Sequence, residues 1–138
     1  MNQQSSTVFY VDDNPGARDL LRGVLRDSGF QVITASNPLE AVELCKRVLF
    51  DLALLEYEMQ YLASSRLVQE IHSLEPRVPV VMISGRASCP PVEWCQADAN
   101  FGRGTSVDDL LETMWLLAGS KPDKTAGRRS AAAWSDST

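Results

Sequence analysis

Short apolar runs that alternate with amphipathic segments constrain the fold of this chain more than any other feature. Five such runs predict β-strands at 8–11, 31–35, 52–55, 80–83 and 99–101. Most are apolar at consecutive positions, which is typical of strands buried on both faces of a sheet. Strands that alternate with helices build a parallel sheet covered by helices on both sides. The sequence therefore predicts an α/β, doubly wound, flavodoxin-like domain whose five-stranded parallel sheet has the strand order 2-1-3-4-5.

Capping residues and turn formers bound the helices between these strands. Asn14-Pro15 and Ser36-Asn37-Pro38 are typical of helix starts, and Ser28-Gly29 is typical of a helix end. Two further helices are predicted at 62–74 and 107–117. Apolar residues at helical spacing predict the inward faces of the four helices, which are Ala17, Leu20, Leu21, Val24 and Leu25; Leu39, Val42, Cys45, Val48 and Leu49; Leu67, Val68, Ile71 and Leu74; and Val107, Leu110, Leu111, Met114 and Leu117.

Charge and composition divide the chain into one domain and a tail. Residues 1–117 form the predicted domain, and 118–138, which lack an apolar period, are expected to be a disordered polar tail. The domain carries nine basic and sixteen acidic side chains, so no nucleic-acid partner is expected, because such a partner needs a clustered basic face. The first residues do not resemble a signal peptide, and no apolar run is long enough to span a membrane. We therefore expect a stand-alone cytoplasmic protein.

Polar side chains follow the predicted strands at the points where the strands end. Asp12 and Asp13 follow the first strand, Glu56 the third, Ser84 the fourth and Arg103 the fifth. The carboxyl ends of parallel strands share one edge of the sheet, and three carboxylates there would repel one another unless a cation such as Mg²⁺ relieved the charge. The alternative is that each residue is ordinary turn, cap or surface chemistry. The combination favours a functional site.

Five segments resemble the receiver domains of response regulators. These are Val11–Asn14, Asp51–Gln60, Val80–Gly85, Ala97–Ala99 with the following Arg103, and Ser106–Leu111, and the resemblance spans 7–117. The resemblance implies that Asp12, Asp13 and Glu56 could hold Mg²⁺, and that Glu56 occupies the phosphoacceptor position. It further implies that Ser84 supplies the hydroxyl group and that Arg103 stands in the lysine position. The implied partners are a sensor kinase or a downstream signalling protein.

The departures from this family's pattern are as informative as the matches. Glu56 stands where the family has its phosphate-accepting aspartate, Arg103 where it has lysine, and Gly104 where it has proline. Asn100 stands where many members carry a switching aromatic residue. The fourth helix, near 91–97, is expected to be shortened, because the spacing from Ser84 to Arg103 is short and prolines precede it. The chain is therefore expected to be an atypical receiver, a pseudo-receiver.

These departures leave several functional interpretations open. A Glu56–Arg103 ion pair could latch the domain in one signalling state, the site could have lost its phosphate chemistry, or weak phosphorylation could persist. In each case we expect a non-catalytic module of two-component phosphorelay signalling that acts by protein–protein interaction. Asn100, Trp94 and Trp115 are the candidate switch or interface residues. The alternative is a small Mg²⁺-dependent phosphatase or phosphotransferase with Asp12 as nucleophile, although the chain lacks the Asp-x-Asp spacing of such enzymes.

Overall fold

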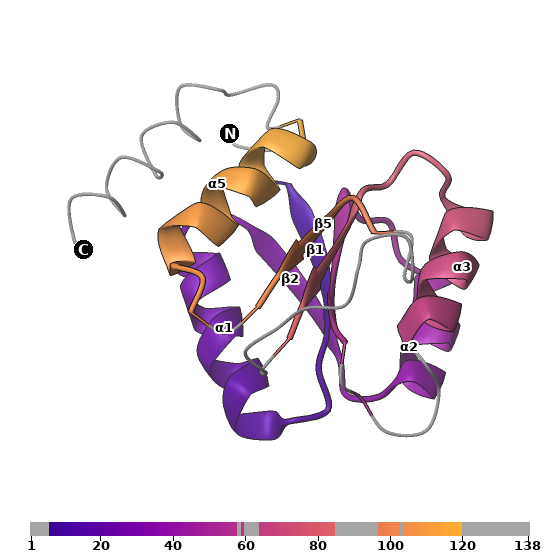
Figure 1. The fold of residues 1–138 in the computed structure, drawn as a ribbon. Coiled ribbons are helices and arrows are strands. Elements are labelled where there is room, and N and C mark those ends of the chain that lie inside the picture. Colours follow the sequence, from indigo (N-terminus) through magenta and orange to yellow (C-terminus); the bar gives the residue numbers. More distant parts are fainter. Residues whose placement is uncertain (1–5, 58, 60–63, 85–96, 103, 120–138) are drawn as a thin grey trace.

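A five-stranded parallel sheet forms the centre of the computed structural model (Figure 1). The structure describes residues 6–57, 59, 64–84, 97–102 and 104–119. The strand order is β2-β1-β3-β4-β5, which confirms the predicted doubly wound topology. The strands are β1 (Thr7–Val11), β2 (Gln31–Ala35), β3 (Leu52–Glu56), β4 (Val80–Ile83) and β5 (Ala99–Phe101).

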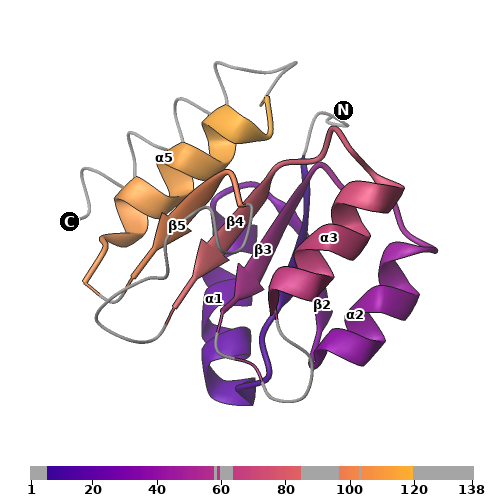
Figure 2. The same cartoon turned by 45° about the vertical axis from the view of Figure 1, so that its right-hand side comes forward.

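Helices cover both faces of this sheet, as Figures 1 and 2 show. Helices α2 and α3 lie on one face and α1 and α5 on the other. Their bounds are α1 (Pro15–Asp27), α2 (Pro38–Cys45), α3 (Ser64–Leu74) and α5 (Val107–Leu117). Residues 85–96, where a shortened fourth helix was predicted, and the tail from 120 onward lie outside the described residues. No helix in the described part of the chain is long and apolar enough to cross a membrane.

Two apolar clusters, one on each face, follow from the period of two along the strands. In β1, Phe9 and Val11 belong to the cluster that α2 and α3 cover, with Ala41 of α2 among its members. Val8 and Tyr10 belong to the opposite cluster, under α1 and α5. The continuous apolar run of β1 is therefore divided between two cores, as expected for a strand buried on both sides.

Side-chain caps start three of the helices. Asn14 Oδ1 accepts the Ala17 N–H at 3.0 Å, and Asn37 Oδ1 accepts the Glu40 N–H at 2.8 Å. Ser106 Oγ accepts the Asp109 N–H at the start of α5, at 3.1 Å. Each cap satisfies a first-turn N–H that has no partner within its own helix. The two helix starts expected from Asn-Pro are thus confirmed.

The inward face predicted for the first helix is too wide. Leu20 is 72% exposed and Ala17 is also exposed, whereas Leu25 is fully buried and Leu21 and Val24 are half-buried. The helix contacts the sheet through a narrower stripe than its apolar pattern indicates. An apolar residue on a helix surface is common in soluble proteins, so the pattern alone overestimates what is buried.

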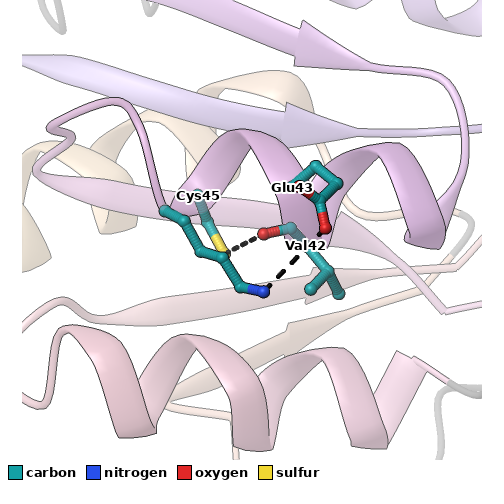
Figure 3. A network of polar contacts seen from close by, with 4 residues as sticks. Val42, Glu43 and Cys45 are labelled. Carbon is teal, nitrogen blue, oxygen red and sulfur yellow. Dashed lines mark hydrogen bonds and ion pairs between the residues drawn. The ribbon is translucent and has the colours of Figure 1, made fainter.

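The second helix is shorter than predicted, and its predicted inward face is confirmed in part, because Cys45 is buried and Val42 packs against the core. It ends at Cys45, and Leu39 and Leu49 are 66% and 84% exposed. Its buried residues are Pro38, Ala41 and Cys45, which lie on one face because they are three and four residues apart. At its end, the Cys45 thiol donates to the Val42 carbonyl oxygen at 3.2 Å and an ion pair joins Lys46 to Glu43 (Figure 3).

Candidate functional site

Three neighbouring strands deliver polar residues to the carboxyl edge of the sheet. Val11 pairs with Leu55, so Asp12 comes beside Glu56, the last residue of β3. Glu56 in turn pairs with Ile83, which places Ser84 next along the same edge. Asp12 and Ser84 are only 3% and 6% exposed, and Glu56 is half-buried. The edge predicted from the sequence therefore brings these residues into one neighbourhood.

Asp12 is held by hydrogen bonds at every polar group that it has. Its Oδ2 accepts the Tyr10 hydroxyl at 2.7 Å and its Oδ1 accepts the Asn14 N–H at 2.9 Å. Its carbonyl oxygen accepts from Arg18 Nη1 at 2.9 Å, and its own N–H donates to the Ala35 carbonyl oxygen at 3.2 Å. The buried carboxylate thus has partners on both oxygens, as a buried charge requires. Its position is fixed by the protein itself.

The Tyr10 hydroxyl group is surrounded by the apolar core and by the negatively charged carboxylates at this edge. Burial raises the pKa of Tyr10 well above its ordinary value, and the hydrogen bond to Asp12 and the charges of Asp12 and Glu56 raise it further. The positive charge of Arg18 opposes the shift. The phenol therefore keeps its proton at physiological pH and acts as a donor. It also lies within the electrostatic reach of the carboxylates from two strands.

At the start of α2, the carboxylate of Glu40 binds the residue that follows β2. Glu40 Oε1 accepts both the N–H and the hydroxyl of Ser36, at 2.7 and 2.8 Å. These bonds, backbone first, hold the pKa of Glu40 below its ordinary value, and the charge of Arg18 adds to the effect. Arg18 therefore acts both on the Asp12 loop, through its hydrogen bond to the Asp12 carbonyl oxygen, and on Glu40 at the start of α2, through its charge.

Ser84 and Asn100 lie where the strand prediction puts them. The Ser84 N–H donates to the Phe101 carbonyl oxygen at 2.9 Å, which fixes the end of β4 against β5. Asn100 is half-buried in the middle of β5 and pairs with Met82. Both residues have further interactions of their own. Their roles as hydroxyl donor and switch residue stay predictions.

The remaining predicted residues divide between the core and the undescribed segments. Trp115 is half-buried and stacks on Phe30, with ring centroids 4.2 Å apart and planes inclined by 20°. Its Nε1 is buried without a hydrogen-bond partner among the described residues. Arg103 and Trp94 lie outside the described residues. The interface role of both tryptophans and the Glu56–Arg103 ion pair stay predictions.

Gly104, directly after Arg103, adopts a backbone conformation that proline cannot. Its φ is +96°, in the left-handed region that favours glycine. The pyrrolidine ring of proline fixes φ near −65°. The resemblance described above expects proline at this position, and proline could not adopt the φ that Gly104 has here.

Magnesium fits this edge by the chemistry of the donors. Asp12, Asp13 and Glu56 offer carboxylate oxygens, the ligands that Mg²⁺ prefers, and one or two carboxylates with water molecules suffice to bind it. Within the described ranges, no three His, Cys, Asp or Glu side chains are placed so as to hold a metal ion together. The assignment of Asp12, Asp13 and Glu56 as metal ligands therefore stays a prediction.

Sequence reasoning missed Tyr10 as a residue of this site. It had been assigned to the buried strand only. The signal was present, because Tyr10 and Asp12 are two residues apart in an extended segment and so point to the same side. A buried tyrosine hydroxyl also needs a hydrogen-bond partner. Together these two facts predict the Tyr10–Asp12 contact.

Known proteins give a consistent picture of the fold and of its family. The family model for the response regulator receiver domain matches residues 8–100. The chain is 29% identical over 90 residues to the transcriptional regulatory protein GlrR of Escherichia coli K12. That match covers 65% of this chain but only 20% of GlrR, so the chain spans about a fifth of this relative's length.

Two solved structures share the architecture closely. The receiver domain of the sensor histidine kinase PA1611 of Pseudomonas aeruginosa, described with a magnesium ion in its active-site cleft, has a TM-score of 0.74 at 22% identity, with 83% of this chain and 98% of that chain covered. The response regulator TrrA of Thermotoga maritima, in complex with Mg²⁺ and BeF, has a TM-score of 0.72 at 25% identity, with 81% and 98% covered. Because the family model matches residues 8–100, which are more than half of the chain, the chain belongs to the response regulator receiver domain family.

Proposed function

We propose that this receiver domain is a non-catalytic pseudo-receiver that is not efficiently phosphorylated and acts by binding another protein of a phosphorelay. The observation that carries the proposal is Glu56. It ends β3 beside Asp12, at the position where the family has its phosphate-accepting aspartate. Asp12 and Ser84 follow the two neighbouring strands along the same edge, which supports Glu56 as the residue at the acceptor position.

The extra methylene group of glutamate accounts for the proposed loss of phosphorylation. It displaces the carboxylate by about 1.3 Å and adds a rotatable bond. Transfer of a phosphoryl group needs an in-line approach, and a misplacement of this size costs a large factor in rate. The neighbouring Asp12 is fixed by its hydrogen bonds, so we expect little adjustment around the longer side chain.

In one version of this proposal, an ion pair between Glu56 and Arg103 holds the domain permanently in one signalling state. A guanidinium group can bind a carboxylate through two parallel hydrogen bonds, which an ammonium group cannot do. A carboxylate carries one charge where a phosphoryl group carries nearly two, so its imitation of the phosphorylated state is incomplete. A scaffold without any phosphate response is the competing form.

Asp12 is poorly suited to the alternative enzymatic role. As a nucleophile in a phosphatase or phosphotransferase it would have to come into direct contact with the phosphorus atom of a substrate. Asp12 is only 3% exposed, which leaves little access for a substrate of that size. This arrangement favours an interaction module over an enzyme.

The relatives indicate the class of partner. GlrR is a transcriptional regulatory protein and PA1611 is a sensor histidine kinase, so receiver domains of this family occur in both kinds of protein. We propose a sensor kinase or a downstream signalling protein as the partner of this chain. Magnesium is proposed at Asp12, Asp13 and Glu56, by analogy with the solved relatives that contain it.

Intact-mass measurement after incubation with acetyl phosphate and Mg²⁺ tests the proposal. We expect no adduct on the native chain and one phosphoryl adduct on Glu56→Asp, because the shorter side chain restores the acceptor geometry. Glu43→Asp, the same change on the exposed side of α2, is the matched control and should stay unmodified.

A stable adduct on the native chain would contradict the proposal. An adduct that persists when Glu56 is changed to Gln would place the acceptor elsewhere. Since Gly104, Arg103 and Asn100 also depart from the family, Glu56→Asp is expected to restore the acceptor without restoring partner binding that depends on phosphorylation.

A further inference from the structure

Tyr10 joins the apolar core to the acidic edge of the sheet. Its ring is fully buried in the cluster under α1 and α5, together with Leu25, Leu54 and Met114. Its hydroxyl group reaches the end of the same strand and donates to Asp12 Oδ2 at 2.7 Å. A phenylalanine would supply nearly the same apolar surface, so the hydroxyl group is the part of this residue that the core does not require.

We propose that Tyr10 is a positioning residue, whose buried hydroxyl group fixes the Asp12 carboxylate in the orientation in which it helps to hold a divalent cation. The proposal rests on the cation site proposed at Asp12, Asp13 and Glu56. It is independent of whether Glu56 accepts a phosphoryl group.

Two donors on different oxygens determine the orientation of the Asp12 carboxylate. The Asn14 N–H holds Oδ1 and the Tyr10 hydroxyl holds Oδ2. Each carboxylate oxygen can accept two hydrogen bonds, so neither of these bonds by itself prevents its oxygen from also binding a cation or the water bound to a cation. Without the hydroxyl group, the Asn14 N–H would be the one donor to this carboxylate among the described residues, and rotation about the terminal bond of Asp12 would be less restricted.

The donor itself has little freedom to move. The Tyr10 ring is enclosed by the core, and only rotation of its O–H bond is left. Partners that orient a metal ligand in this way typically change metal affinity by about 10- to 100-fold when they are removed.

Calorimetric titration of Mg²⁺ into the native protein and Tyr10→Phe tests the role. We expect affinity to fall about tenfold in Tyr10→Phe. Ser28→Ala is the matched control, because it removes another buried hydroxyl group, which donates to the Val24 carbonyl oxygen at the far end of α1. It should lower stability but leave Mg²⁺ affinity unchanged. In an Asp12→Asn background, Tyr10→Phe should have no further effect, because Tyr10 acts through Asp12.

Unchanged or tighter Mg²⁺ binding by Tyr10→Phe would overturn the proposal, and so would an equal loss of affinity in the Asp12→Asn background. A native chain that does not bind Mg²⁺ would overturn it as well, while the acetyl phosphate experiment would still decide the proposed function separately. Should Tyr10→Phe fail to fold, the Tyr10 Cζ resonance of the native protein gives a second measurement. We expect it to shift on Mg²⁺ addition, and a resonance that does not move contradicts the proposal.

Discussion

The two edges of the sheet use the same residue type in opposite ways. At the amino edge, Asp51 precedes β3 and accepts the Thr7 N–H of β1 at 2.7 Å, while its own N–H donates to the Thr7 carbonyl oxygen at 2.8 Å. Asp98 precedes β5 and repeats this arrangement with Val80 of β4, at 2.8 and 2.7 Å. At the carboxyl edge, Asp12 and Glu56 lie beside each other instead.

We infer from this difference that the hydrogen-bond partner of an aspartate, and not its place at a strand end, decides what the aspartate contributes. Each amino-edge aspartate satisfies a strand-start N–H that would otherwise lack a partner, so it contributes to stability. The carboxyl-edge acids gather like charges in one place, which opposes stability and favours cation binding. Substitutions at the two edges should therefore differ in sign.

The largest effect is expected for Asp98→Ala. It leaves the N–H of the fully buried Val80 without its acceptor, and a loss of this kind costs about 2 kcal/mol in the free energy of unfolding. Urea denaturation followed by circular dichroism measures the change. Asp98→Asn is the control, since the amide keeps one acceptor oxygen and should lose less than half as much. If Asp98→Ala lowers the free energy of unfolding by less than about 0.5 kcal/mol, the aspartates of the amino edge do not stabilise the fold in the way proposed.

The strands were predictable because each is a continuous apolar run between turn residues. The topology followed from their alternation with helices, and the structure confirms it. Helix faces were less predictable. Leu20 and Leu39 fit the apolar period but are exposed, because a helix in an outer layer of this three-layered fold buries only the stripe that contacts the sheet. Periodicity specifies which residues share a face, but not how much of that face is covered.

The candidate site was predictable as far as strand ends alone determine it. Asp12, Glu56 and Ser84 follow their strands directly, so topology was enough to bring them together. Tyr10 and Arg18 were missed because their roles depend on hydrogen bonds to Asp12, which no spacing rule assigns without asking where a buried polar group finds its partner. Predicting these two residues requires asking both where their side chains pack and where the buried polar groups find hydrogen-bond partners.

A smaller effect of opposite sign is expected at the carboxyl edge for Asp13→Asn. The substitution is isosteric and removes one of the neighbouring negative charges. In metal-free buffer the free energy of unfolding should stay unchanged or rise by up to about 1 kcal/mol. The increase in Tm that Mg²⁺ produces should become smaller, because at a given Mg²⁺ concentration a weaker-binding site stabilises the folded state less.

Thermal unfolding with and without Mg²⁺ measures both quantities for Asp13→Asn. Asp51→Asn, the same change at the amino edge, is the matched control and should keep the native response to Mg²⁺. If Asp13→Asn lowers stability in metal-free buffer as strongly as Asp98→Ala does, the two edges do not differ in the way proposed.

The smallest effect on the free energy of unfolding is expected for Glu40. It lies at the carboxyl edge, but its carboxylate accepts a backbone N–H, as the aspartates of the amino edge do. Hydrogen bonds from the backbone and side chain of Ser36 lower its pKa in the folded state from the ordinary 4.5. Its contribution is therefore fully present above pH 4.5 and is lost as the pH falls through the lower, folded-state pKa. Because Glu40 is exposed, we expect only about 0.5 kcal/mol.

Urea denaturation of the native chain and Glu40→Gln across the acid range measures this contribution. The difference in unfolding free energy between the two should be largest at neutral pH and should vanish at a pH below the folded-state pKa of Glu40. Ser36→Ala keeps the backbone donor, so it should retain most of the pH dependence. If the native chain is instead less stable than Glu40→Gln at neutral pH and this deficit disappears as the pH falls, repulsion from its carboxyl-edge neighbours outweighs the bond to Ser36. In that case position at the edge, and not the hydrogen-bond partner, would decide what an acid does in this domain.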